Sequence, residues 1–167
     1  MRRLILTRHA KSSWSATGPA DHDRPLNGRG RKAASRIGDW LTARGYLPDE
    51  LLCSTAQRAR ETWNGMAPAL AGPQPRAEYL RGLYMAAPIA IQDALRGASG
   101  ECVLLICHNP GIGAFAHAMP RHLPEHMKFG KYPTGATLVL EFDLDDWRDV
   151  QPGTGEILDF IVPRDLD

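Results

Sequence analysis

The stretch Cys102-Val-Leu-Leu-Ile-Cys-His-Asn-Pro-Gly111 is the most informative part of this sequence for the fold. Its first six residues form a continuous apolar run, as is typical of a strand that is buried on both faces. The run ends at His108, and the residues from Ile112 to Met119 favour a helix. A buried strand that leads through a short loop into a helix is the repeating unit of parallel α/β sheets.

The same alternation of strand and helix extends to both sides of this stretch. Gly45 follows the last apolar residue of a predicted helix that begins after Asn27, at the place where a left-handed glycine commonly ends a helix. Pro88 stands at the first position of another predicted helix. The remaining predicted strands are residues 4–6, 51–53, 76–79, 138–142 and 157–162, and the remaining helix is 55–63, with Ser54 or Thr55 as its N-cap. We therefore expect a three-layer α/β/α fold with a mostly parallel central sheet, in which residues 1–167 form one domain with short loops and no lid domain.

Composition and charge exclude several classes of protein. The net charge is only +1, so nucleic-acid binding is not expected. No stretch approaches the roughly 20 apolar residues of a membrane-spanning helix, and the apolar run near the N-terminus stops at Thr7, too early for an export signal. Three cysteines within apolar runs indicate free buried thiols, which predicts a cytoplasmic protein.

Charged and polar residues follow three of the predicted strands. Arg8 and His9 follow the first strand, the segment from Ser54 to Arg58 follows the second, and His108 follows the strongest. In sheets of this kind, ligands bind beyond the carboxyl ends of the strands, so these residues are expected at one edge. Arginines bind phosphate oxygens through forked donors, and a neutral imidazole can attack phosphorus. The sequence therefore predicts a phosphoryl-transfer site.

Several motifs carry a resemblance to a known family. Leu6-Thr7-Arg8-His9-Ala10 resembles the Arg-His-Gly signature of the histidine phosphatase (phosphoglycerate mutase-like) superfamily. The segments Ser54–Thr62 and Leu105–Pro110 resemble its second and third blocks. Arg24-Pro-Leu-Asn-Gly-Arg-Gly30, together with Pro133–Ala136, is similar to the small SixA-like branch. Ala10 and Cys107 replace glycines of the pattern, and Cys107 fits only if the backbone there needs no positive φ.

The resemblance implies a role for each of these residues. His9 would carry a phosphohistidine intermediate, Arg8 and Arg58 would bind the phosphoryl oxygens, and His108 would stabilise the transition state. Ser54 and Asn109 would also line the substrate site. The resemblance implies neither a metal nor another cofactor, and it points to phosphohistidine in proteins as the substrate. A small-molecule phosphomonoester phosphatase and a non-catalytic phosphate-binding module are the alternatives.

The proton donor is the least defined part of the predicted site. Larger members of the superfamily use a carboxylate to protonate the leaving oxygen, and Asp21, Asp23 and Glu78 are the candidates here. The two aspartates could instead cap the following helix or pair with Arg24. If no acid is present, substrates whose leaving group departs easily, such as phosphohistidine, should be favoured over alkyl phosphates.

Two other catalytic chemistries fit the sequence poorly. A cysteine-dependent phosphatase needs an arginine six residues after the cysteine, but Ala59 and Gly113 occupy those positions after Cys53 and Cys107. A metal site built from His117, His122 and His126 matches no strong ligand spacing, because prolines interrupt the segment.

Overall fold

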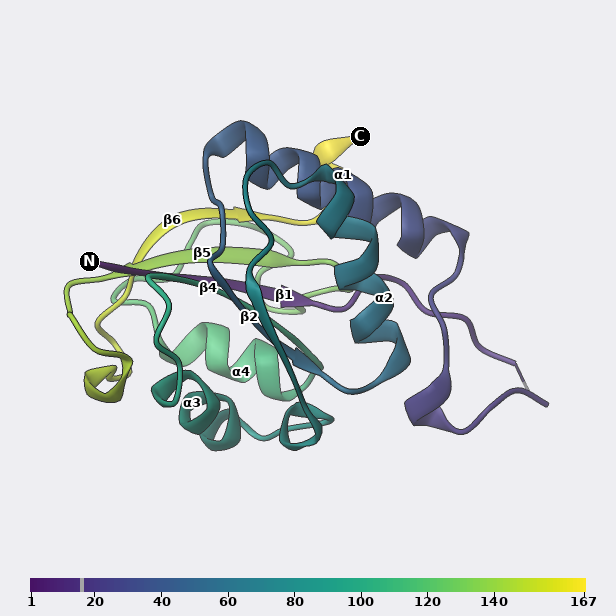
Figure 1. Cartoon of the computed structure of the whole chain (residues 1–167), viewed down its shortest axis with the longest axis horizontal. Helices are drawn as coiled ribbons and strands as arrows, with labels where there is room; N and C mark the ends of the chain where they lie inside the picture. The colour runs from purple at the N-terminus through teal and green to yellow at the C-terminus, as the bar shows by residue number, and fades with distance from the viewer. Residues whose placement is uncertain (16) are drawn as a thin grey trace.

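The computed structural model describes residues 1–15 and 17–167, with four α-helices that enclose a six-stranded sheet (Figure 1). The strands are β1 (Arg2–Arg8), β2 (Glu50–Ser54), β3 (Arg76–Leu80), β4 (Cys102–Cys107), β5 (Thr137–Phe142) and β6 (Glu156–Ile161). The helices are α1 (Gly28–Arg44), α2 (Gln57–Met66), α3 (Pro88–Arg96) and α4 (Gly111–Ala118). Five short 3₁₀ segments connect them: η1 (Asp21–Asp23), η2 (Ala67–Ala69), η3 (Arg81–Leu83), η4 (Trp147–Asp149) and η5 (Pro163–Leu166).

The sheet has the strand order β3-β2-β4-β1-β5-β6. The pairs β3 with β2, β2 with β4, and β4 with β1 are parallel, whereas β5 runs antiparallel to both β1 and β6. The expected mostly parallel sheet is therefore confirmed. Because β1, β2 and β4 are parallel neighbours, their carboxyl ends lie at one edge, on the right in Figure 1.

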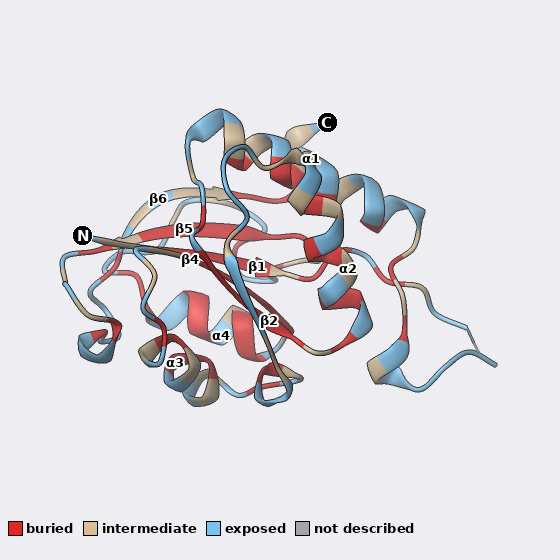
Figure 2. Ribbon diagram, viewed as in Figure 1, coloured by how far each residue is buried: buried red, intermediate tan, exposed pale blue. Residues whose placement is uncertain are grey.

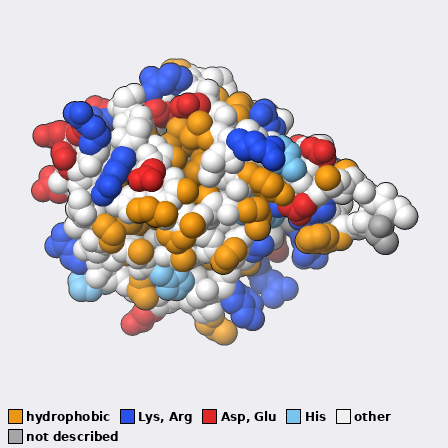
Figure 3. Space-filling model, turned by 90° about the horizontal axis from the view of Figure 1, so that it is seen from below, with side chains coloured by type: hydrophobic (Ala, Val, Ile, Leu, Met, Phe, Trp, Pro, Cys, Tyr) orange, Lys and Arg blue, Asp and Glu red, His pale blue; other side chains and the backbone are white. Residues whose placement is uncertain are grey.

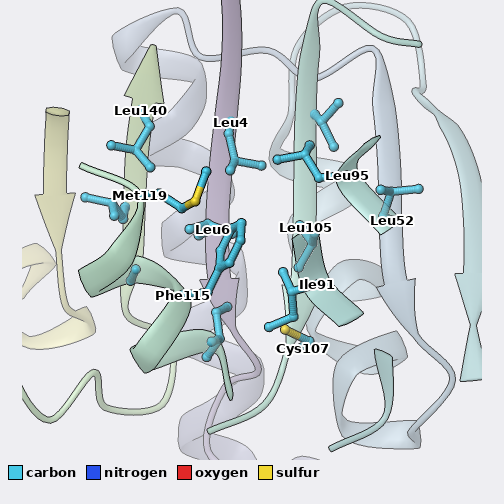
Figure 4. Packing of buried hydrophobic residues seen from close by; sticks show 14 of the residues in the cluster. Leu4, Leu6, Leu52, Ile91, Leu95, Leu105, Cys107, Phe115, Met119 and Leu140 are labelled. Atoms are coloured by element: carbon cyan, nitrogen blue, oxygen red, sulfur yellow. The ribbon is translucent and has the colours of Figure 1, made fainter. Parts of the chain in front are cut away.

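Alternating residues of the strands form two separate cores, one on each face of the sheet. Leu4, Leu6 and Leu105 pack against α3 and α4, through side chains such as Phe115 and Met119 (Figure 4). Ile5 and its neighbours on the opposite face pack against α1 and α2. Figure 2 shows the resulting arrangement, in which buried strands lie between helices that are exposed on their outer sides. Both faces of these strands are covered, which explains their continuous apolar runs.

Local signals in the sequence placed most helix ends correctly. The helix α1 begins after Asn27, whose side chain accepts a hydrogen bond from the Gly30 amide, and it ends at Gly45 with φ of 74°. The N-cap prediction for α2 was wrong, because Ala56 occupies that position without a side-chain cap. Ser54 instead belongs to β2, where its hydroxyl accepts a hydrogen bond from the Ala56 amide.

The face of the molecule that bears α3 and α4 combines apolar and charged side chains. Figure 3 shows the face that bears α3 and α4, where hydrophobic side chains gather near the middle and charged side chains of both signs lie around the margin. None of the helices in residues 1–15 and 17–167 combines the length and apolarity that crossing a membrane requires.

Candidate active site

His9 lies directly after β1, at the carboxyl edge of the sheet. Its side chain is 5% exposed, and its Nδ1 atom lies 2.8 Å from the Ala10 carbonyl oxygen. A carbonyl only accepts, so Nδ1 must carry the proton and donate it. The lone pair is then on Nε2, the ring nitrogen that is free to attack an electrophile.

His108 follows β4 and faces His9 across the site. The centroids of the two imidazole rings are 5.2 Å apart, and the His108 side chain is 1% exposed. Its Nε2 atom lies 2.7 Å from the oxygen of the Ser54 hydroxyl. The same oxygen accepts a hydrogen bond from the Ala56 amide. When Ser54 donates to Nε2, the proton of His108 resides on Nδ1, which is buried and has no partner among the described residues.

The two predicted arginines reach the site from β1 and α2. Arg8 donates from Nη1 to the Tyr132 carbonyl at 3.3 Å. The Arg58 guanidinium is anchored by Asp21, through the backbone carbonyl at 2.7 Å and the carboxylate at 3.0 Å. Arg58 is 3% exposed, so its charge acts with little screening by solvent. Guanidinium groups are charged at neutral pH, so Arg8 and Arg58 place positive charge beside the histidines.

A pocket of about 230 Å³ contains most of the predicted residues. Its lining includes Arg8, His9, Asp21, Arg58, His108 and Asn109. The lining also includes Lys11 and five residues to which sequence reasoning gave no role in the site: Ser12, Trp14, Arg24, Met85 and Thr134. Ser54 is placed behind His108 rather than in the lining. The structure therefore brings the four proposed catalytic residues together.

Asn109 has a structural role that its position in the sequence did not reveal. Its amide nitrogen donates to the carbonyls of Lys131 and Tyr132, both at 3.0 Å, and its amide oxygen accepts from Gly113. These contacts hold the segment after Phe129 against the start of α4. We therefore expect Asn109 to shape the pocket wall as well as line it.

Arg24 could have been recognised from the Arg-Pro-Leu motif that begins with it. It donates to the Ser12 hydroxyl at 2.7 Å and to the Ser13 carbonyl at 2.8 Å, and its guanidinium carbon lies 3.5 Å from the centre of the Trp14 ring. Only the structure shows that these contacts turn the loop after His9 toward the pocket.

Burial keeps both histidines neutral. Loss of solvation is the largest cause, and it lowers the pKa of His9 and of His108 from 6.5 to about 3. The neighbouring positive charges of Arg8 and Arg58 lower the pKa values further. When Ser54 donates to Nε2, a neutral His108 still carries a proton on Nδ1 and can donate it in a hydrogen bond.

The three candidate proton donors lie in different environments. Asp21 lies in the pocket, where hydrogen bonds from Tyr84, Arg24 and Arg58 hold the pKa of its carboxyl below the usual range. It pairs with Arg24 at 3.1 Å, which confirms one of the alternatives for this residue. An ionised carboxylate has no proton to give, so the environment of Asp21 argues against that role.

The other two carboxylates lie away from the reacting groups. Asp23 is exposed and pairs with His22 at 3.3 Å. Glu78 is exposed on β3 and does not line the pocket. Their placement corrects the interpretation of both as donors.

Among the described residues, no group of three or more metal-ligand side chains is positioned to hold a metal ion.

The two positions that depart from the glycine pattern are accommodated. Cys107 is the last residue of β4, and it is not among the described non-glycine residues with positive φ. Burial raises the pKa of its thiol to about 12, so it stays protonated. Ala10 is fully buried, and its amide donates to the Thr62 hydroxyl at 2.9 Å. The backbone beside each histidine is therefore compatible with a side chain.

The buried histidines should make stability depend on pH. Because their pKa values are about 6.5 unfolded and about 3 folded, protons bind preferentially to the unfolded chain as the pH falls below 6.5. We expect this to cost up to roughly 2 kcal/mol for each histidine at pH 5. Urea unfolding at pH 7 and pH 5 measures it. The double variant His9→Asn/His108→Asn should lose less stability than the wild type over this interval, and an equal loss in both proteins would refute the assignment.

Comparisons with known proteins agree with this geometry. Residues 4–84 match the family model of the histidine phosphatase superfamily (branch 1). A protein of Mycobacterium tuberculosis without a characterised function is 36% identical over 169 residues, which cover 94% of this chain and 99% of that protein. The chain belongs to the histidine phosphatase superfamily. Members of this superfamily include phosphatases, and this histidine phosphatase is accordingly a hydrolase of that kind.

Solved structures resemble this histidine phosphatase over nearly its whole length. The putative phosphohistidine phosphatase SixA from Nakamurella multipartitia superposes with a TM-score of 0.80 at 28% identity, covering 97% of this chain and 96% of that one. The corresponding protein from Agrobacterium tumefaciens superposes with a TM-score of 0.78 at 29% identity, covering 97% and 98%. The protein histidine phosphatase SixA complexed with tungstate, at 22% identity and a TM-score of 0.79, shares the fold.

Proposed function

We propose that this histidine phosphatase removes phosphoryl groups from phosphohistidine in proteins, with His9 as the nucleophile. The observation that carries this proposal is the environment of His9. Its Nδ1 proton is held by the Ala10 carbonyl, and its ring is neutral beside two arginines and His108. A neutral imidazole in a pocket of positive charge is suited to attack an anionic phosphoryl group.

The reaction has two steps. In the first, His9 Nε2 forms a bond to phosphorus while the bond from phosphorus to the substrate nitrogen breaks. Arg8 and Arg58 bind the phosphoryl oxygens, and His108 donates its Nδ1 proton in a hydrogen bond to the oxygens as charge develops. In the second step, water attacks the phosphohistidine, the bond to His9 breaks, and a proton of the water passes to solvent.

The substrate class follows from the leaving group. An alkoxide needs a proton in order to leave, whereas a phosphorylated imidazole that is protonated on its other nitrogen leaves as neutral imidazole. Asp21 is held ionised by its partners and cannot supply that proton. The site therefore favours a phosphoryl group on nitrogen. A side chain on a protein surface can reach it, because no lid domain covers the pocket in the described residues.

The cytoplasm is the compartment that fits this proposal. The three cysteines are free thiols, and Cys53 and Cys107 are buried. Free thiols persist in reducing compartments.

The substrate class can be tested with three compounds. We expect kcat/KM for a phosphohistidine peptide to exceed that for a sugar phosphate by at least about 10², the factor that general-acid catalysis typically supplies. An aryl phosphate, whose leaving group is acidic, should fall between them. Equal values for the peptide and the sugar phosphate would favour a small-molecule phosphomonoesterase. Phosphate binding without turnover of any compound would favour a non-catalytic module.

Ser54 should position His108 for its part in the reaction. Its buried hydroxyl connects the Ala56 amide to His108 Nε2. We expect Ser54→Ala to lower kcat for the aryl phosphate by between about tenfold and a hundredfold, because the His108 ring loses its fixed orientation. Ser35→Ala makes the same change at an exposed position of α1 and should leave kcat unaltered. An unchanged kcat in the folded Ser54→Ala variant would refute the role of the hydroxyl.

A further inference from the structure

A second hollow adjoins the catalytic pocket. We name it the basic groove; it has a volume of about 280 Å³, and its lining is Lys11, Arg29, Ala33, Lys128, Lys131, Pro133, Thr134, Val162, Pro163 and Arg164. Lys11 and Thr134 line both the groove and the catalytic pocket. A substrate held at His9 can therefore extend into the basic groove without leaving the protein surface.

The groove is formed by segments that are far apart in the sequence. Arg29 and Ala33 come from α1, Arg164 comes from η5, and Lys131 comes from the segment before β5. Gly30 allows α1 to approach the loop after His9 closely, because a Cβ atom there would lie 2.0 Å from the Lys11 carbonyl oxygen. The close approach places Lys11 between the two cavities. Figure 1 shows α1 and the C-terminus side by side.

All charged side chains that line the basic groove are positive. Its lining contains five cationic side chains and no acidic one, and none of the five forms an ion pair with a described carboxylate. Several surface arginines elsewhere have carboxylate partners, among them Arg3, Arg44, Arg76, Arg121 and Arg148, whereas the exposed Arg60 and Arg81 have none among the described residues. Unpaired cations gathered in one concavity attract an anionic ligand.

The groove continues away from the catalytic pocket. A third hollow, of about 290 Å³, shares Arg29, Ala33, Pro163 and Arg164 with it. Lys32 and Arg36 add positive charge there, and Asp167 pairs with Arg36 at its far side. Three connected hollows suit an extended chain better than a compact metabolite, which would fill only one of them.

The lining also indicates which kind of chain binds. Ala33, Pro133 and Pro163 supply apolar surface between the cations, and no aromatic residue lines the basic groove or the third hollow. Proteins that bind single-stranded nucleic acids rely on aromatic side chains that stack on the bases. Apolar contacts between cations instead match a peptide that carries both acidic and aliphatic side chains.

From this arrangement we infer that the basic groove binds an acidic segment of the protein substrate, next to its phosphorylated residue. The inference rests on the proposed function, because it assumes that the phosphoryl group is carried by a protein. Carboxylates of the segment pair with Lys128, Lys131 and Arg164 while the phosphoryl group lies at His9. The groove thereby selects among phosphoproteins by the charge of the flanking sequence.

Two phosphohistidine peptides that differ only in their flanking residues test this recognition. One carries aspartates and glutamates beside the phosphohistidine, and the other carries asparagines and glutamines. We expect the wild type to prefer the acidic peptide by about tenfold in kcat/KM at low ionic strength, as several exposed ion pairs would provide. Added salt should reduce the preference.

Variants of the groove separate charge recognition from catalysis. Lys128→Gln/Lys131→Gln/Arg164→Gln should abolish the preference and leave turnover of an aryl phosphate unchanged. Arg44→Gln/Arg121→Gln/Arg148→Gln removes the same charge elsewhere on the surface and should retain the preference. Equal kcat/KM for the two peptides in the wild type would overturn the inference while the proposed function stands.

A binding measurement distinguishes failure of the groove from failure of catalysis. Fluorescence anisotropy with an unphosphorylated acidic peptide reports on the groove without any reaction. We expect the groove variant to bind this peptide about tenfold more weakly than the wild type, even if phosphohistidine proves not to be a substrate. Tighter binding of a single-stranded RNA, lost in the same variant, would overturn the inference in favour of a nucleic-acid ligand.

Discussion

The His9→Asn variant is expected to lose at least about 10³ in kcat for an aryl phosphate, because the nucleophile of the first step is gone. Asparagine preserves the polarity of the position but has no ring nitrogen that can form a bond to phosphorus. Steady-state turnover measures the loss. The wild type, quenched at alkaline pH during turnover of a radiolabelled substrate, should carry an acid-labile phosphoryl group that the variant lacks.

The control for this experiment is His122→Asn, which makes the same change at an exposed histidine. We expect its turnover and its labelling to match the wild type. Residual turnover above about a tenth of the wild-type rate in His9→Asn, or labelling that persists in it, would mean that another group is the nucleophile. His108 is the neighbouring candidate, with its ring centroid 5.2 Å from that of His9.

The Arg58→Lys variant should lose about 10² to 10³ in kcat/KM for the aryl phosphate. Lysine keeps the positive charge but lacks the planar fork of donors that binds two phosphoryl oxygens and reaches both the backbone carbonyl and the carboxylate of Asp21. The loss should appear largely in kcat if the fork binds the transition state more tightly than the substrate. Initial rates over a range of substrate concentrations separate the two constants.

Arg60→Lys is the matched control, because Arg60 lies on the same helix two residues further on, and it is exposed. Its guanidinium stacks over the Tyr79 ring, 4.3 Å from the ring centre, and does not line the pocket. We expect wild-type kinetics from this control. A folded Arg58→Lys variant with the same kcat/KM as the wild type would remove Arg58 from the proposed machinery.

The secondary structure was largely predictable because strands buried on both faces leave a strong local pattern. The apolar runs of β1 and β4 reflect cores on both sides of the sheet. The N-cap of α2 was not predictable from its residue types. Ser54 and Thr55 both suit that role, but pairing of β2 with its neighbours extends the strand through Ser54 and moves the helix start to Gln57.

The location of the catalytic residues was predictable for a related reason. Residues that follow parallel neighbouring strands must meet at one edge, so the sequence is enough to place Arg8, His9 and His108 together. The proton donor was not predictable in this way. Asp21 lies in a long loop, and only folding of that loop brings it against Arg24, Arg58 and Tyr84.

The sequence by itself determined the layered fold and the residues at the carboxyl edge of its sheet, because short-range patterns and parallel strand order are enough to specify both. Tertiary structure decided the chemical state of those residues. Burial, which no local pattern reports, lowers the pKa of both histidines to about 3, and the ion pairs of Asp21 keep its carboxylate charged. The basic groove likewise exists only after folding, since α1, η5 and the segment before β5 supply its cations from distant parts of the chain.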